Sequence, residues 1–341
     1  MIELLQEMIA IPAFSREEGA VADLLERRLT ESGLMLKRTG NNLWCSTLGD
    51  GPTLLLNAHI DTVRPAAGYT RDPFAPTLEG DRLYGLGAND DGGSVVALIE
   101  TYKILASRPQ PYRLVLSLTA EEEVSGKGGL ELLFPEIGPV ALGVIGEPTG
   151  MQMAVAERGL MVLDCTARGV SGHAARDEGR NAIYLAMEDI KRLRTMDFGR
   201  PSDLLGRVKT TVTQIEAGTQ HNVVPDVCKF VVDVRTNEHV TNQEVLDGIS
   251  RVLQSEVQAR STRLGSSGIA LDHPLVQRGL AMGLRPFGSP TLSNAALCPF
   301  PTLKIGPGDS ARSHGPDEYI CLSEIRDAVG KYVELLDGLK I

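Results

Sequence analysis

Apolar residues in the first 150 positions form short continuous runs that are separated by segments of helical spacing. Such runs indicate strands that are buried on both faces of a sheet. The helical spacing predicts one helix that begins at a capping box (15–18) and ends near Gly33, and another over 93–106. The strand-like runs are LWCSTLG (43–49), GPTLLLNAHID (51–61), RLYGLGANDDGG (82–93), YRLVLSLTA (112–120) and VALGVIGEPT (140–149).

From about residue 157 the pattern changes to an alternation of apolar and polar residues. A period of two is typical of antiparallel strands with one buried face. Two helical segments lie between these strands, at 181 to about 195 and at 242 to about 255, and residues 241–244 form a capping box before the second. The alternating runs are RGLMVLDCTARG (158–169), VKTTVTQIEAG (208–218) and DVCKFVVDVRT (226–236).

The order of these elements predicts an α/β fold with two domains. The larger domain, residues 1–155 and 264–341, is expected to hold a mixed, mostly parallel sheet flanked by helices. Its C-terminal part again shows the pattern of buried strands and helices, with the run TLKIGPGD (302–309) and a closing helix over 323–336. The β-α-β-β-α-β order of residues 156–263 predicts an inserted α+β sandwich of ferredoxin-like topology.

Composition narrows the classes of partner. The 341 residues carry a net charge of −10, which argues against a general nucleic-acid or anionic-membrane surface and is compatible with binding cations. No apolar run approaches the roughly 20 residues of a membrane span, and the first residues are acidic rather than basic. We therefore expect a cytoplasmic protein without an export signal.

The cysteines are odd in number, widely spaced and without a CxxC pattern. This arrangement predicts reduced cysteines, most of them in the core, and neither a disulfide framework nor a thiolate zinc site. The five are Cys45, Cys165, Cys228, Cys298 and Cys321.

Imidazole and carboxylate groups follow five of the predicted strands. A single histidine or aspartate at a strand end is more often structural, in a turn or a cap. The carboxyl ends of parallel strands lie side by side, however, so these groups are expected to converge into a site of nitrogen and oxygen ligands that suits zinc, cobalt or manganese. The groups are His59 and Asp61, the pair Asp90–Asp91, the triplet Glu121–Glu123, Glu147, and His314.

Three adjacent carboxylates in TAEEEVSG (119–126) repel one another unless water or cations compensate their charge. A solvated loop that opens a helix is one interpretation of this triplet. A metal site at the end of the preceding strand is the other.

Seven motifs, in this order, resemble those of the aminoacylase, acetylornithine deacetylase, succinyl-diaminopimelate desuccinylase and carboxypeptidase G family of zinc-dependent amidohydrolases. The resemblance covers almost the whole chain and is most similar to the acetylornithine deacetylase branch. The motifs are NAHIDTV, LYGLGANDDGG, TAEEE, GEPT, GVSGHAA, NVVPD and GPGDSARSHGPDEYI.

The resemblance implies a centre of two zinc ions, for which cobalt or manganese could substitute. His59 and Glu147 would hold one ion, Glu123 and His314 would hold the other, and Asp90 would bridge both. Zinc lowers the pKa of bound water from near 16 to about 7, which makes hydroxide available at neutral pH.

The same resemblance implies roles for residues around the metals. Asp61 would orient the ring of the first histidine through its other nitrogen. Glu122 would be the general base, with Glu121 only a solvated neighbour. His173 would donate to the oxyanion, unless it is a loop histidine that caps a helix.

Two positions of the inserted domain resemble residues associated with substrate binding. These are Asn222 and Arg235, and the guanidinium would pair with an α-carboxylate. For Arg235, a surface position on a strand is the alternative.

Two positions depart from the family's pattern. Gly92 stands where a lysine is common, so that DDGG replaces D-x-K-G, and Tyr69 stands where a tryptophan is frequent. No metal ligand is lost by either change.

The leading hypothesis is a deacylase that removes an acetyl or succinyl group from an α-amino acid such as ornithine or citrulline, in arginine biosynthesis. The alternatives are a dipeptidase, tripeptidase or carboxypeptidase, a succinyl-diaminopimelate desuccinylase, or a metal-binding protein that has lost catalysis. The inserted domain is expected to form a homodimer through an exposed sheet edge.

Overall fold

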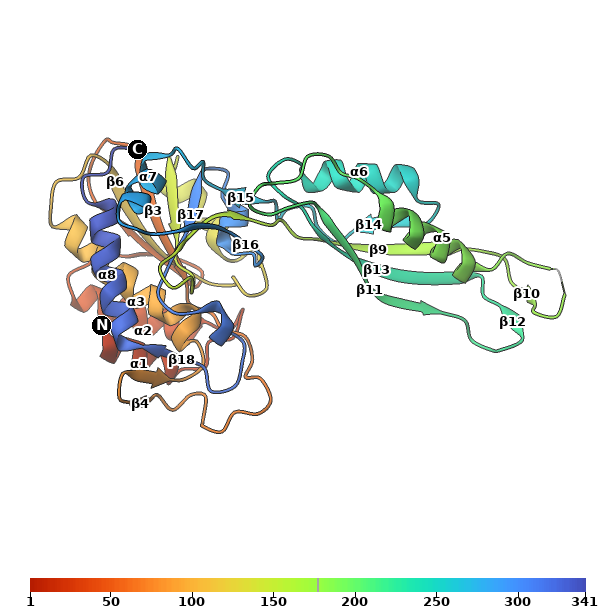
Figure 1. Cartoon of the computed structure of the whole chain (residues 1–341). Helices are drawn as coiled ribbons and strands as arrows, with labels where there is room; N and C mark the ends of the chain where they lie inside the picture. Colours follow the sequence, from red (N-terminus) through yellow and green to blue (C-terminus); the bar gives the residue numbers. More distant parts are fainter. Residues whose placement is uncertain (177) are drawn as a thin grey trace. The chain divides into compact units, whose positions relative to one another are not determined.

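The computed structural model describes residues 1–176 and 178–341 and divides the chain into two compact units (Figure 1). The first unit comprises Met1–Val155, Gly268–Phe287 and Ser293–Ile341, and the second comprises Ala156–Ser267 and Gly288–Leu292.

The second unit extends beyond residue 263, where the pattern placed its end. Ser266 Oγ donates to the carbonyl oxygen of Glu157 at 2.6 Å, and Ser267 Oγ donates to the carboxylate of Glu157 at 3.1 Å. These two bonds keep residues 264–267 with the second unit. Alternation of side chains along a strand carries no signal for such a bond.

A mixed sheet with a parallel centre forms the first unit, as expected for the α/β class. The parallel strands stand in the order β6-β3-β7-β17, and β2 and β8 pair antiparallel with β6 and β17 at its two sides. The full order is β1-β2-β6-β3-β7-β17-β8-β15, with β16 paired to β8. The strands are β1 Lys37–Thr39, β2 Asn42–Ser46, β3 Thr53–His59, β6 Arg113–Thr119, β7 Leu142–Ile145, β8 Met153–Glu157, β15 Ser267–Gly268, β16 Pro286–Ser289 and β17 Thr302–Lys304.

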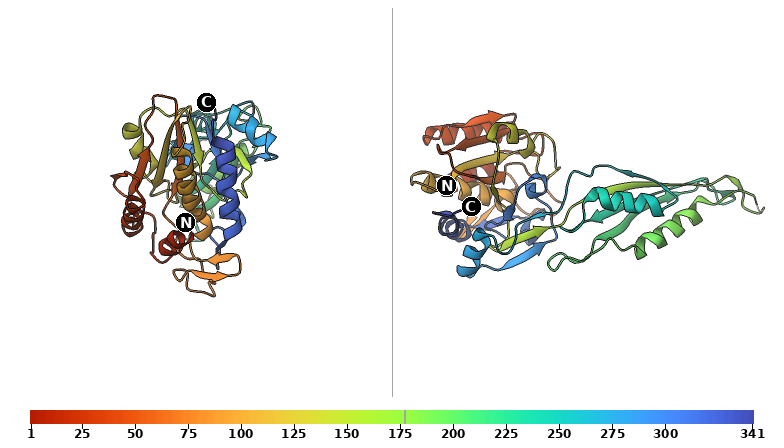
Figure 2. Two further views of the ribbon diagram at one scale, coloured as in Figure 1. Left: turned by 90° about the vertical axis from the view of Figure 1, so that its left-hand side faces the viewer. Right: turned by 90° about the horizontal axis from the view of Figure 1, so that it is seen from above.

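Helices cover both faces of this sheet (Figure 2). Leu54 and Leu56 of β3 face one hydrophobic cluster, and the intervening Leu55 faces another, so every residue of the strand is buried. This is why the run TLLLNA is continuously apolar. The helices of the first unit are α1 Ile2–Ile9, α2 Gly19–Glu31, α3 Gly93–Ala106, α4 Phe134–Ile137, α7 Pro274–Ala281 and α8 Leu322–Leu336, with 3₁₀ turns at Leu130–Leu133, Asn294–Leu297 and Ser310–Arg312.

The predicted capping box at the start of α2 is wrong. The helix begins at Gly19 with Glu18 as its N-cap residue, and no side chain in the described part of the chain caps it. Ser15 Oγ donates instead to Asp61 Oδ2 at 2.7 Å. The fold brings Asp61 close to Ser15, so the hydroxyl that local spacing predicted as a helix cap donates to this carboxylate instead.

The run RLYGLGANDDGG forms a strand only over its first residues, Arg82–Tyr84 (β5). The part Ala88–Gly92 is a helical turn that leads into α3, and Asp90 departs from helical geometry within it, with φ −124° and ψ 95°. β5 pairs with β4 (Thr77–Glu79) and β18 (Tyr319–Cys321). Asp90 lies in the turn directly before α3, and this helix packs on the central strands β3 and β6.

The second unit contains a four-stranded antiparallel sheet of order β11-β13-β9-β14, and its elements follow the expected β-α-β-β-α-β order. Its helices share one hydrophobic cluster with the sheet. The capping box of Thr241 and Glu244 is present, as predicted. The elements are β9 Met161–Arg168, α5 Ala182–Thr195, β11 Lys209–Ala217, β13 Val227–Arg235, α6 Asn242–Val252 and β14 Glu256–Ala259, with a small ladder of β10 Gly172–His173 and β12 Val223–Val224.

All five cysteines are present as thiols, and three of them are buried. Within residues 1–176 and 178–341, every helix is too short or too polar to cross a bilayer.

A buried amide connects the strands beneath the carboxyl edge of the sheet, and this generates a test of stability. Asn57 is fully buried, donates to Ser117 Oγ at 3.0 Å and Thr119 Oγ1 at 2.9 Å, and accepts from Asn294 Nδ2 at 3.1 Å. Asn57→Ala leaves these partners buried without it, so the free energy of unfolding should fall by about 2–4 kcal/mol in denaturant titration. The exposed Ser107→Ala is the control; an equal loss in both variants would contradict the assignment.

Candidate metal centre

The acidic and imidazole side chains singled out by the sequence lie at one edge of the central sheet. His59 is the last residue of β3, the three glutamates follow β6, and Glu147 follows β7 by two residues. The loop after β17 carries His314. Since these four strands are parallel neighbours, their carboxyl ends bring the loops together.

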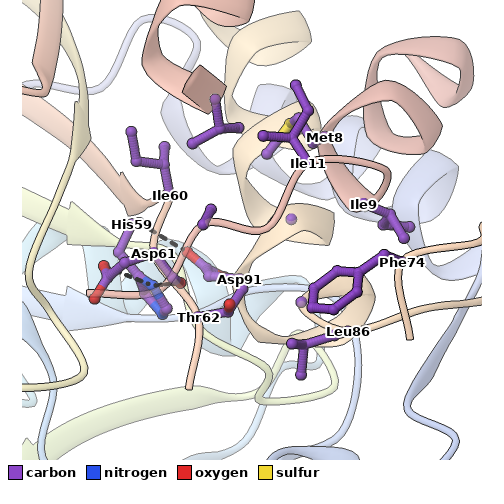
Figure 3. Close-up of a pocket in the computed structure, with 14 residues that line it drawn as sticks. Met8, Ile9, Ile11, His59, Ile60, Asp61, Thr62, Phe74, Leu86 and Asp91 are labelled. Carbon is purple, nitrogen blue, oxygen red and sulfur yellow. Dashed lines mark hydrogen bonds and ion pairs between the residues drawn. The ribbon is translucent and has the colours of Figure 1, made fainter. Parts of the chain in front are cut away.

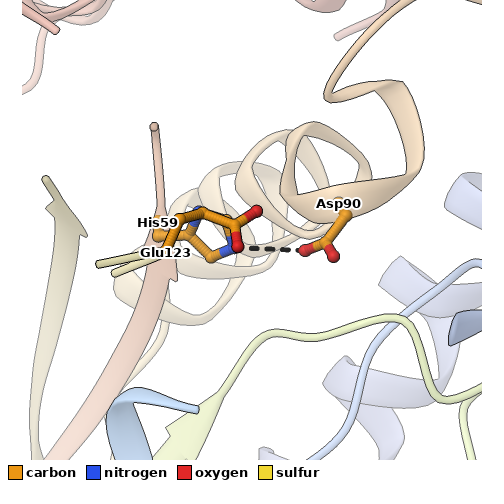
Figure 4. A group of neighbouring side chains, drawn as sticks. All are labelled: His59, Asp90 and Glu123. Atoms are coloured by element: carbon orange, nitrogen blue, oxygen red, sulfur yellow. Dashed lines mark hydrogen bonds and ion pairs between the residues drawn. The ribbon is translucent and has the colours of Figure 1, made fainter. Parts of the chain in front are cut away.

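Asp90 lies between the two histidines. Its Oδ1 is 3.1 Å from His59 Nε2, and its Oδ2 is 3.6 Å from His314 Nε2. His314 Nε2 also lies 3.0 Å from Glu123 Oε1. Figure 4 shows His59, Asp90 and Glu123 pointing toward one another. One carboxylate that offers an oxygen to each histidine has the geometry of a bridging ligand.

Among the residues that the structure describes, two groups of three side chains have ligand atoms within 4.8 Å of one another: His59 with Asp90 and Glu123, and His59 with Glu122 and Glu147. Two ligands of one tetrahedral zinc ion stand about 3 Å apart, so the His59–Asp90 and His314–Glu123 separations fit a shared ion. Imidazole nitrogen and carboxylate oxygen without thiolate suit zinc, cobalt or manganese. The residues fit a centre of divalent metal ions.

Asp61 orients this centre differently from the expectation. His59 Nδ1 lies 2.9 Å from the carbonyl oxygen of Asp61 and 3.5 Å from its carboxylate Oδ1. The carboxylate accepts the main-chain N–H groups of Glu122 at 3.0 Å and Glu123 at 3.1 Å. Asp61 therefore holds the histidine with its main chain and the acidic loop with its side chain.

Glu318 was not assigned a role from the sequence, although it lies within the motif GPDEYI. It is 3% exposed, and its Oε1 accepts the N–H groups of Asn89 at 2.8 Å and Asp90 at 3.0 Å. A buried carboxylate thus fixes the main chain of the bridging residue. Burial raises the pKa of Glu318 to about 7.

Lys304, the last residue of β17, was also missed. It is 4% exposed, and its Nζ lies 3.9 Å from Glu147 Oε2. A lysine in an apolar strand run is the signal that could have found it, because lysine is almost never fully buried unless it is paired.

Gly92 has no room for the lysine of the family's pattern. A Cβ atom there would lie 2.5 Å from the carbonyl oxygen of Gly87 and 2.6 Å from Leu5 Cδ1. The turn before α3 is packed so closely that only glycine fits at position 92, which explains why this chain lacks the lysine of D-x-K-G.

His173, Asn222 and Arg235 belong to the second unit. His173 is exposed on β10 and its Nδ1 accepts the N–H of Ala175 at 3.1 Å, and Asn222 is exposed beside β12. The carbonyl oxygen of Asn222 accepts the N–H of Ala174 at 2.9 Å, so the fold of this unit brings the His173 and Asn222 segments together.

Arg235, at the end of β13, is paired within the second unit. Its guanidinium contacts the carboxylate of Asp233 twice, at 2.9 and 3.1 Å. The side chain is 29% exposed.

A small cavity of about 20 Å³ lies behind His59 (Figure 3). Thr62 Oγ1 and Asp91 Oδ1 line it and have no hydrogen-bond partner in the described part of the chain. Its volume matches about one water molecule and is far below the several hundred Å³ of a substrate pocket. The cavity therefore concerns the packing around His59 and not substrate binding.

Comparison with known proteins identifies the family. The model of peptidase family M20/M25/M40 matches residues 55–338, most of the chain. The chain belongs to this family.

Similar proteins include two named biosynthetic enzymes. An acetylornithine deacetylase of Proteus mirabilis is 27% identical, with 98% of this chain and 96% of the relative covered. A succinyl-diaminopimelate desuccinylase of Cereibacter sphaeroides is 30% identical, with 70% of this chain and 68% of the relative covered. Membership of the M20 family makes the chain an amidohydrolase.

Solved structures share the fold. A tripeptidase of Staphylococcus aureus is 20% identical with a TM-score of 0.76, and coverage is 98% of this chain and 96% of that one. The YXEP protein of Bacillus subtilis, a dinuclear metal binding peptidase, is 17% identical with a TM-score of 0.74 and the same coverage.

The centre of this M20 chain attracts positive charge strongly. Burial alone would lower the pKa of His59, but the carboxylates of Asp61 and Asp90 beside its two ring nitrogens outweigh this effect, and the pKa lies well above its usual value. Burial, with the charges of Glu147 and Glu123, raises the pKa of Glu122 well above that of a free glutamate. The field that retains protons here also favours divalent cations.

The His314–Glu123 contact predicts a pH dependence in chelator-treated protein. The hydrogen bond to Glu123 raises the pKa of His314 to about 9, from an unfolded value near 6.5. A raised pKa contributes stability that is complete below pH about 6.5 and is lost as the pH rises through about 9. NMR titration of His314 should report this pKa, and Glu123→Gln should return it toward the unfolded value.

The melting temperature in chelator provides the second measurement. Between pH 6.5 and 9 the wild type should lose more stability than Glu123→Gln, while the exposed control Asp50→Asn should follow the wild type. A wild-type His314 pKa near 6.5 would contradict the contact.

Proposed function

We propose that this amidohydrolase cleaves the amide bond of an N-acyl α-amino acid, with an acetyl or succinyl acyl group and ornithine, citrulline or a related amino acid. The observation that carries the proposal is the position of Glu122, beside His59 and Glu147 at the edge where Asp90 joins both histidines. The names of the relatives from Proteus mirabilis and Cereibacter sphaeroides support the acyl-amino-acid class, and arginine biosynthesis is the corresponding setting.

The proposed centre holds two divalent ions, zinc in the first place, with cobalt or manganese as substitutes. His59 and Glu147 would bind one, Glu123 and His314 the other, and Asp90 both. Such ions supply ionised water at neutral pH and polarise a carbonyl group.

Glu122 is the proposed general base. Asp61 fixes its main-chain N–H at 3.0 Å, so the side chain projects from an anchored position. The raised pKa suits a group that first accepts a proton from water and then delivers it to the leaving nitrogen. Asp61 acts through the positions of His59 and Glu122.

Roles at the substrate are proposed for three residues of the second unit. His173 is proposed to donate to the oxyanion. Asn222 and Arg235 are proposed to bind the substrate, and for Arg235 the pair with Asp233 must open before a substrate carboxylate can replace it.

A homodimer through the second unit is proposed from the sheet order. β11 stands at the end of the order β11-β13-β9-β14 and is nine residues long, so its outer edge can pair with a second copy. A biosynthetic amidohydrolase whose cysteines are thiols is proposed to act in the cytoplasm.

The proposed function is tested by a steady-state screen of substrates. N-acetyl and N-succinyl derivatives of ornithine, citrulline and diaminopimelate are assayed against dipeptides and tripeptides, with and without chelator. At least one N-acyl amino acid should exceed every peptide in kcat/KM by tenfold or more, and chelator should abolish turnover. Peptides as the best substrates would instead assign a peptidase, and metal-loaded protein without turnover would assign a binding protein.

The roles of Glu122 and Asp90 separate chemistry from metal binding. Glu122→Gln keeps the shape of the side chain and removes the base, so two metal ions per chain should remain while kcat falls by about 10²–10⁴-fold. Asp90→Ala removes the bridging carboxylate, so elemental analysis should find at most one ion. A fully loaded Asp90→Ala would contradict the bridging role, and near wild-type turnover of Glu122→Gln would contradict the base.

A further inference from the structure

The acidic loop after β6 is tightly folded on itself. Glu121 and Ser125 have positive φ angles of 58° and 46°, and the N–H of Gly126 donates to the carbonyl oxygen of Glu121 at 2.8 Å. The carboxylate of Glu121 accepts the N–H of Gly128 at 3.1 Å, and Cβ atoms at Gly126 or Gly128 would clash with it. From the sequence, Glu121 was expected to be only a solvated neighbour of the base. The structure shows instead that its side chain holds the loop together.

A segment near the N-terminus, residues 14–18, lies against this loop and is here called the strap. Phe14 forms a parallel bridge with Thr62, and the N–H of Thr62 donates to the carbonyl oxygen of Ala13 at 2.8 Å. The strap therefore runs beside the chain that leaves β3 and carries Asp61.

Glu18 is the buried end of the strap, with 1% exposure. Its Oε1 accepts the N–H of Arg16 at 2.5 Å and that of Glu121 at 3.2 Å, and its Oε2 accepts Asn41 Nδ2 at 3.1 Å. A carboxylate withdrawn from water is stable only with such donors, so the loop and the strap fix each other.

Ser15 continues the same arrangement. Its hydroxyl donates to Asp61 Oδ2 at 2.7 Å, and this carboxylate accepts the N–H groups of Glu122 and Glu123. Three successive amides of the acidic loop therefore end on two carboxylates: Glu18 takes the first, and Asp61, held by Ser15, takes the next two.

We propose that the strap positions the proposed base, with Glu18 as the main positioning residue and Ser15 as the second. Glu18 holds the amide of the residue directly before Glu122, and its side-chain contacts in the structure are made with the strap, Asn41 and the loop. The inference rests on the proposed function only for its kinetic part. A displacement of about 1 Å at a reacting group can lower a rate about 10²-fold, so loss of the strap is expected to act on kcat.

The first test compares three single variants of the full, metal-loaded chain. Glu18→Ala removes the acceptor and should lower kcat about 10- to 100-fold, with KM changed less than threefold and two metal ions retained. Glu18→Gln keeps an acceptor for the amide of Glu121, because the amide of Asn41 can turn to face it, and should restore kcat to within about threefold of the wild type. Glu17→Ala, an exposed neighbour whose partner is Arg64, should change neither value.

The double variant Glu18→Ala with Glu122→Gln shows whether Glu18 acts through the base. It should be no slower than Glu122→Gln alone, because a base that has been removed cannot be misplaced. Rate losses that multiply in the double variant would overturn the proposal, as would a Glu18→Ala kcat within threefold of the wild type.

Hydrogen exchange supplies a readout that does not need turnover. Peptides that cover residues 120–128 should exchange at least fivefold faster in Glu18→Ala, with unchanged exchange in Glu17→Ala and in strands β3 and β6. Unchanged exchange in the loop would overturn the proposal, whether or not the proposed substrates are correct. Faster exchange in a chain that hydrolyses no N-acyl amino acid would support the role of the strap and contradict the proposed function. If Glu18→Ala does not fold, Ser15→Ala takes its place and should lower kcat about tenfold. Ser15→Thr keeps the hydroxyl and should restore kcat. An unchanged kcat in Ser15→Ala would overturn the proposal.

Discussion

Main-chain N–H groups that donate to buried carboxylates hold the candidate metal centre together. Asp61 accepts the amides of Glu122 and Glu123, and Glu318 accepts those of Asn89 and Asp90. A buried carboxylate without donors is unstable, and a loop amide without an acceptor is equally costly. Each satisfies the other, so the loops of the sheet edge are fixed by acids that are themselves outside the proposed ligand set.

This arrangement concentrates negative charge where the parallel strands end. Burial, with the charges of the neighbouring acids, raises the pKa of Glu122, and the acids beside their rings raise the pKa values of His59 and His314. The same field favours divalent cations. Folding energy from the leucine-rich strands supports a centre that is electrostatically unfavourable by itself, as is usual where function requires strain.

The proposed chemistry places different demands on the two units. The first unit must hold a base, two histidines and a bridging aspartate in fixed positions, and it does so from strand ends and from loops anchored by buried acids. The second unit has an antiparallel sheet with one helical face and carries His173 on a short ladder. A rigid set of ligands and a separate set of residues for the acyl amino acid would allow relatives of one fold to differ in substrate.

The sequence by itself determined most of the central strands and helices and the chemistry of the side chains. Continuous apolar runs predicted β3, β6 and β7, because both faces of the central sheet are covered. Alternating residues predicted β9, β11 and β13, because the sheet of the second unit has helices on one face only. The ordered motifs also named the family and the residues that the structure brings to one edge. Tertiary structure decided the partners: Ser15 bonds to Asp61 and not to its own helix, Glu18 to the acidic loop, and Glu318 to the amide of Asp90. These contacts join residues 46 to 228 positions apart, and local spacing carries no signal for them because the hydrogen bond depends on distance in space alone.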